Sequence, residues 1–149
     1  MIRYLLDTDV ICKRSRTNGG NIRRWIESVD DNELAISVIT IFEISKGIQK
    51  KRDAGDSATA DGLQASLDQL KAGFHGRIFP VDPSVAEAWG SCAGSELKQW
   101  MDRALIATAR TKGLILVTCN SADLRGHGVE VINPDRKKFG HWASDGTEL

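Results

Sequence analysis

Short apolar runs alternate along this chain with stretches of helical periodicity, and this alternation limits the folds open to it. The clearest run is Leu114-Ile115-Leu116-Val117, whose length and composition indicate a buried strand. Similar runs occupy residues 4–6, 34–37, 77–81 and 129–132. Between them, apolar residues recur three and four positions apart, as on one face of a helix. The pattern predicts βαβ units and an α/β fold with a mostly parallel sheet.

Capping and turn residues set the expected helix boundaries. Asn21 is expected to cap one helix, and either Ser37 or Thr40 to start another. Residues 53–60 are small and polar, so a turn is expected there. A long helix is expected from about residue 96 to residue 112, because a glycine follows as its stop.

Length and charge bound the domain organisation and the class of protein. The 149 residues suit one domain, which is expected over residues 1–134, followed by a polar, partly mobile tail over residues 135–149. Lys plus Arg and Asp plus Glu both number 20, so the net charge is zero. This balance does not support a broadly basic nucleic-acid binder, but it leaves room for an acidic, metal-filled pocket beside basic patches.

The cysteines and the lengths of the apolar runs indicate where in the cell the protein is expected. Cys12, Cys92 and Cys119 are odd in number and far apart, which gives neither a disulfide framework nor a zinc spacing. No apolar run approaches the ~20 residues of a membrane-spanning helix. A cytoplasmic protein with no membrane contact is therefore expected.

Acidic residues near the strand ends are the candidate functional residues. Asp7 ends the first strand, and ligands of open parallel sheets bind at the carboxyl ends of strands, where the loop 118–123 should also lie. Four acids are candidates for one cluster: Asp7, Glu43, Asp102 and Asp123. Carboxylate oxygens suit Mg²⁺ or Mn²⁺ better than zinc. Such a site can activate water and neutralise charge on a phosphodiester.

Each of these polar residues also has a purely structural explanation. Glu43 follows Thr40 by three positions, which is the spacing of a capping box. Asp102 could be a first-turn helix acid or a surface charge. Three others could cap a helix or hold a turn: Asp9, Asn120 and Asp123. Because two of the acidic sites follow strands, the four together favour a cluster over separate structural roles.

Four sequence blocks, in order over nearly the whole chain, resemble PIN-domain toxins of the VapC/FitB-like type. They are LLDTDVI at residues 5–11, SVITIFEISKG at 37–47, DRALIATA at 102–109, and TCNSADL at 118–124 followed by GVEVINP at 128–134. The resemblance implies a three-layer α/β/α sandwich and an Mg²⁺- or Mn²⁺-dependent endoribonuclease, the toxin of a type II toxin–antitoxin system. It also implies a cognate antitoxin, a tRNA or rRNA substrate, a homodimer and a toxin–antitoxin hetero-oligomer.

The same resemblance assigns roles to individual residues. It implies a catalytic quartet of Asp7, Glu43, Asp102 and Asp123, in which the three aspartates hold the metal. It implies support from Thr8, Asp9, Thr118 and Asn120. Among the basic residues, the candidates for contacting an RNA backbone are Arg14, Arg16 and Lys46.

The blocks depart from the family pattern at four places. Asp9 stands where Asn is usual, Cys119 where Arg is common, and Leu124 where Phe is common. The stretch before Asp102 is shorter than usual, which makes Glu96 a rival for the third acid.

Two rival functions remain open. A haloacid-dehalogenase-like phosphatase is suggested by Asp7-Thr8-Asp9 and by Thr118, each after a strand, but the chain offers neither paired aspartates after a late strand nor a motif lysine. A PIN-like RNA-binding module without catalysis is the other alternative, and the four acids argue against it.

Overall fold

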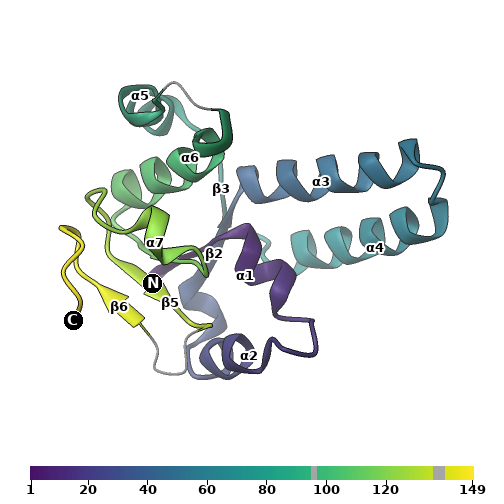
Figure 1. Ribbon diagram of the computed structural model, residues 1–149, viewed down its shortest axis with the longest axis horizontal. Coiled ribbons are helices and arrows are strands. Elements are labelled where there is room, and N and C mark those ends of the chain that lie inside the picture. The colour runs from purple at the N-terminus through teal and green to yellow at the C-terminus, as the bar shows by residue number, and fades with distance from the viewer. Residues whose placement is uncertain (95–96, 136–139) are drawn as a thin grey trace.

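The computed structural model describes residues 1–94, 97–135 and 140–149, and within them six strands form one sheet (Figure 1). The strands are β1 (Tyr4–Leu6), β2 (Leu34–Ser37), β3 (Ile78–Phe79), β4 (Ile115–Val117), β5 (Val131–Asn133) and β6 (Gly140–Trp142). Their order across the sheet is β3-β2-β1-β4-β5-β6. Neighbouring strands from β3 to β5 pair in parallel, and β6 is antiparallel to β5. The predicted α/β fold with a mostly parallel sheet is confirmed.

The helices connect the parallel strands. They are α1 (Thr8–Lys13), α2 (Gly20–Glu27), α3 (Val38–Asp53), α4 (Ser57–Gly73), α5 (Pro83–Cys92), α6 (Leu97–Lys112) and α7 (Ser121–Leu124), with a 3₁₀ turn over Asp31–Glu33. Ser37, one of the two expected starts, caps α3 by accepting a hydrogen bond from the amide of Ile39 at 3.0 Å. In Figure 1, α3 and α4 lie side by side and project away from the sheet.

Several expected boundaries were wrong. The strands expected over residues 77–81 and 129–132 are Ile78–Phe79 and Val131–Asn133. Gly19 rather than Asn21 precedes α2, so the helix starts before the expected cap. The turn expected over residues 53–60 is shorter, because the carboxylate of Asp56 accepts a hydrogen bond from the amide of Thr59 at 3.2 Å and starts α4 at once. The loop expected over 118–123 contains the short helix α7.

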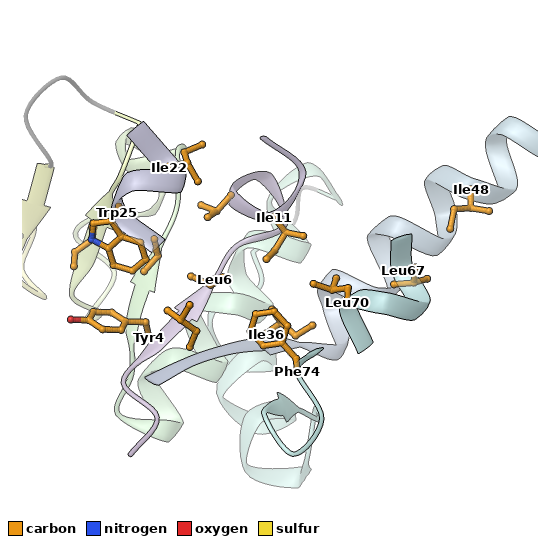
Figure 2. Packing of buried hydrophobic residues seen from close by; sticks show 14 of the residues in the cluster. Tyr4, Leu6, Ile11, Ile22, Trp25, Ile36, Ile48, Leu67, Leu70 and Phe74 are labelled. Carbon is orange, nitrogen blue, oxygen red and sulfur yellow. The ribbon is translucent and has the colours of Figure 1, made fainter. Parts of the chain in front are cut away.

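Apolar residues of β1 divide the core into two clusters. Tyr4 and Leu6 belong to one cluster, together with residues of α1, α2 and α4 (Figure 2). Leu5 belongs to the other cluster, which includes Leu105 of α6 and Leu116 of β4. Successive side chains of a strand point to opposite faces, so the two clusters lie on the two sides of the sheet. The expected three-layer α/β/α sandwich is therefore confirmed.

The C-terminal segment contributes to the sheet. Trp142 of β6 pairs with Val131 of β5 and is 1% exposed within the second core cluster. Phe139, the other aromatic residue of the segment, lies outside the described residues. The domain boundary at residue 134 and the mobility of the tail stay predictions. Among the described helices, none is long and apolar enough to cross a membrane.

Candidate active site

Asp7 lies at the carboxyl end of β1 and is 6% exposed. Its Oδ1 accepts a hydrogen bond from the amide of Thr8 at 2.6 Å, and its Oδ2 accepts one from the hydroxyl of Thr118 at 2.8 Å. Thr118 directly follows β4, and Leu6 pairs with Val117 in the sheet. Parallel pairing thus places two strand ends together, so that a residue 111 positions later fixes the Asp7 carboxylate.

Thr8 connects the first strand end to α3. Its hydroxyl donates a hydrogen bond to Oε1 of Glu43 at 2.8 Å, and its oxygen also lies 3.0 Å from Oγ1 of the buried Thr40. Because α3 begins at Val38, Thr40 lies inside the helix and cannot be its N-cap. The capping-box explanation of Glu43 is therefore excluded. Thr40, which the sequence suggested only as a helix start, helps to position Thr8.

Asp9 connects α1 to the segment after β4. Its two carboxylate oxygens accept the amide hydrogen bond of Cys119 at distances of 3.2 and 3.3 Å. The cap of α1 is Asp7, since the helix begins at Thr8, so the suggestion that Asp9 caps this helix was wrong. Asp9 instead holds the backbone that leads from β4 to α7.

A polar network sets the position of α7. The amide of Asn120 donates a hydrogen bond to Oγ1 of Thr118 at 3.0 Å. The buried Asn133 donates from Nδ2 to the carbonyl of Cys119 at 3.3 Å and to Oγ of Ser121 at 3.1 Å. In the sequence, Asn133 directly follows the apolar run over residues 129–132. The strand-end argument that selected Asp7 applies to it equally and would have found it.

The last two acids line a polar hollow of about 660 Å³ between α6 and α7. The polar residues lining it include Gln99, Asp102, Arg103, Asn120, Asp123 and His127. Asp102 is half-buried on α6, one turn before the buried Leu105 and Ile106. Asp123 is exposed in the first turn of α7. Glu96, the rival third acid, lies outside the described residues.

Burial and mutual repulsion raise the pKa values of carboxylates in this region. Burial raises the pKa of Asp7 from 3.8 to about 7, and the nearby charges of Asp9, Asp102 and Glu43 add to this, while the Thr118 hydrogen bond opposes it. Burial also raises the pKa values of Asp9 and Glu43. Asp7, Asp9, Glu43 and Asp102 thus share one electrostatic environment.

The donor set suits a hard divalent cation. Clustered carboxylates repel one another, and Mg²⁺ or Mn²⁺ would relieve both the repulsion and the cost of burying Asp7. Within residues 1–94, 97–135 and 140–149, however, no three His, Cys, Asp or Glu side chains lie close enough together to hold an ion as they stand. The ligand assignment of Asp7, Asp102 and Asp123 therefore stays a prediction.

The three residues expected to contact RNA lie in two different places. Arg14 and Arg16 line a largely apolar groove of about 670 Å³, with Leu70 among its other walls. Lys46 is exposed on α3, one turn after Glu43, and its charge lowers the Glu43 pKa against the larger effect of burial. Lys46 thus lies near the acids, whereas the two arginines border a different hollow.

Comparison with known proteins identifies the family. The sequence model of the PIN domain matches residues 4–125, so the chain belongs to the PIN domain family. The crystal structure of FitAcB from Neisseria gonorrhoeae is 28% identical, with a TM-score of 0.75, over 88% of this chain and 97% of that one. DNA-bound VapBC from Salmonella typhimurium covers the same shares at 20% identity, with a TM-score of 0.70. No curated protein matches the chain. The predicted resemblance to PIN toxins of the VapC/FitB type is confirmed.

The raised pKa of Asp7 predicts how stability depends on pH. Between about pH 4 and pH 7 the folded protein keeps a proton on Asp7 that the unfolded chain has lost, so the free energy of unfolding should fall as pH rises through this range. At roughly 1.4 kcal/mol per pKa unit, metal-free Asp7→Asn should be more stable than the wild type by a few kcal/mol at pH 8. Urea unfolding in EDTA at pH 5 and pH 8 measures this difference.

Matched measurements complete this test. Asp61→Asn, at an exposed carboxylate paired with Arg52, should keep the wild-type pH dependence. Mg²⁺ or Mn²⁺ at pH 8 should stabilise the wild type and not Asp7→Asn, because only the wild type regains a compensating charge. An identical pH dependence in Asp7→Asn and the wild type would contradict the assignment of this titration to Asp7.

Proposed function

We propose that this protein is the toxin of a type II toxin–antitoxin system and acts as an Mg²⁺- or Mn²⁺-dependent endoribonuclease. The observation that carries the proposal is the buried Asp7 carboxylate at a strand end of a PIN fold, in the field of Asp9, Glu43 and Asp102. Such a buried group of acids is costly unless a cation binds there. RNA is a polyanion, so a metal ion would also make the acidic site compatible with its substrate.

In this proposal, different residues have different roles in phosphodiester hydrolysis. Asp7, Asp102 and Asp123 would hold the divalent ion, which when bound supplies an activated water and charge neutralisation. Thr118 fixes the orientation of Asp7 through its 2.8 Å hydrogen bond. Glu43, whose pKa is raised by burial, is suited to accept a proton from the attacking water, and Thr8 holds its carboxylate in place.

The partners follow from the same assignment. Structures are known of FitAB bound to a DNA fragment and of DNA-bound VapBC from Salmonella typhimurium. Another structural match, from Klebsiella pneumoniae, is 21% identical with a TM-score of 0.61 and is described as a toxin–antitoxin complex. We propose a cognate antitoxin for this chain, bound in a hetero-oligomer around a toxin homodimer. A basic side chain of the antitoxin could supply the cation that the acidic site needs, because arginine binds carboxylates with two hydrogen bonds. The proposed place of action is the cytoplasm, where tRNA and rRNA are available.

Incubation of the purified protein with tRNA and rRNA tests this function. We expect new 5′ ends at defined positions in Mg²⁺ or Mn²⁺, loss of cleavage in excess EDTA, and recovery when the metal is restored. The proposed antitoxin, to be sought as a small open reading frame beside this gene, should form a stable complex with the protein and suppress cleavage. Hydrolysis of phosphomonoesters without RNA cleavage would favour the phosphatase alternative, and RNA binding without cleavage would favour an inactive module.

A further inference from the structure

Two basic side chains border the polar hollow that contains Asp102 and Asp123. Arg103 directly follows Asp102 on α6, and His127 follows α7 by three residues. Nη1 of Arg103 lies 2.6 Å from Nδ1 of His127, and Nε2 of His127 lies 3.2 Å from the backbone carbonyl of Asp123. His127 therefore connects the helix that carries one acid to the helix that carries the other.

Hydrogen-bonding chemistry determines the form of His127. A guanidinium group only donates hydrogen bonds, so Nδ1 of His127 accepts from Arg103. Nε2 must then carry the ring proton, which it donates to the carbonyl of Asp123. His127 is thus a neutral residue that fixes the direction of the Arg103 side chain without neutralising its charge.

Arg103 keeps both its charge and most of its donors. No carboxylate among the described residues forms a salt bridge with Arg103. The guanidinium has five N–H donors, of which His127 occupies one. The hollow of about 660 Å³ falls within the range of roughly 300–1,000 Å³ that is usual for ligand sites. A guanidinium that is oriented by one hydrogen bond and keeps further N–H donors beside a hollow of this size is suited to a bidentate contact with a phosphate.

We infer that Arg103, oriented by His127, binds an RNA phosphate that flanks the one cleaved at the acidic residues. This inference rests on the proposed function, since it assigns part of the RNA-binding surface of that same site. The carboxylates of the site repel the RNA phosphates on both sides of the cleaved bond. The positive charge of Arg103 on α6 would hold one of these phosphates and so fix the position of the RNA strand relative to Asp102. In this role Arg103 binds substrate, and His127 is a positioning residue.

Salt dependence distinguishes a phosphate contact from a structural role. Each phosphate contact to a single strand contributes about 0.7 to the slope of log K against log salt concentration. In an Asp7→Asn background, which prevents cleavage, Arg103→Gln should weaken binding of a short fluorescent single-stranded RNA and lower this slope by about 0.7. Arg24→Gln removes the same charge from the exposed face of α2 and should leave the slope unchanged.

Steady-state kinetics give the second readout. With Asp7 intact, Arg103→Gln should raise KM roughly tenfold with little change in kcat, as expected for the loss of uniform substrate binding. Arg103→Lys should keep the salt slope while losing part of the affinity, because the charge remains and the bidentate geometry does not. His127→Phe should raise KM, and His127→Gln, which retains one donor and one acceptor, should restore it.

The outcomes separate this inference from the proposed function. A thermal unfolding curve establishes that Arg103→Gln is folded. If the wild type cleaves RNA while this folded variant keeps the wild-type KM and salt slope, then the proposed phosphate contact is wrong and the proposed nuclease function is retained. A fall in kcat alone, with the slope unchanged, also overturns it. If the wild type neither binds nor cleaves RNA in Mg²⁺ or Mn²⁺, then the function and the inference fail together.

Discussion

The Asp7→Asn variant is expected to lose RNA cleavage by at least about a thousandfold and to keep its fold. Removal of a single transition-state donor costs roughly 10²–10³-fold in well-studied enzymes, and loss of a charged metal ligand should cost more. The amide has the size of the carboxylate. Its oxygen can accept the hydrogen bond from the Thr8 amide, and its NH2 group can donate to the Thr118 hydroxyl, which lies 2.8 Å from the Asp7 carboxylate. The pKa of about 7 also means that substitution removes a group which is costly to ionise. The fold should therefore survive the change.

Single-turnover cleavage of a defined RNA measures this loss, with circular dichroism and urea unfolding to establish the fold. Asp61→Asn makes the same chemical change at an exposed surface carboxylate and should cleave at the wild-type rate. Cleavage at the wild-type rate by a folded Asp7→Asn protein would remove Asp7 from the catalytic residues.

The Asp102→Ala variant should also abolish cleavage, whereas Glu96→Ala should leave it close to the wild-type rate. Asp102 contributes to raising the pKa values of both Asp7 and Glu43, so its charge lies close to both acids. It also lines the hollow that contains Asp123. The adjoining residues Leu105 and Ile106 are buried against the sheet, so α6 holds Asp102 in a defined position. Glu96 lies outside the described residues. In the sequence it comes six positions before Asp102, at the expected start of the helix, where an acid is explained by the helix dipole alone.

The two variants form a matched pair, because each removes one carboxylate from the same segment of the chain. Cleavage rates at saturating Mg²⁺ and across a metal titration separate a lost ligand from a lost substrate contact. The reverse result, with Glu96→Ala inactive and Asp102→Ala active, would show that the third acidic block has been assigned to the wrong residue.

Local sequence was enough to predict the parallel part of the sheet and the position of Asp7 within it. Apolar runs separated by helical patterns specify parallel strands, and parallel strands bring their carboxyl ends to one edge. The meeting of Asp7 with Thr118 follows from that rule, and the 2.8 Å hydrogen bond between them agrees with it. The cap at Ser37 was also within reach of local reasoning, because the hydrogen bond that makes it spans only two residues.

Only the tertiary structure decided how distant polar groups are paired. The pairing of Thr8 with Glu43 spans 35 residues, and that of Arg103 with His127 spans 24, so no local spacing encodes either. Trp142 becomes buried because β6 pairs with β5, although its own three-residue run carries little strand signal. Periodicity determines which face of an element is buried, since that depends on neighbours a few residues away. The partner of a polar side chain depends instead on which elements the packed core brings into contact.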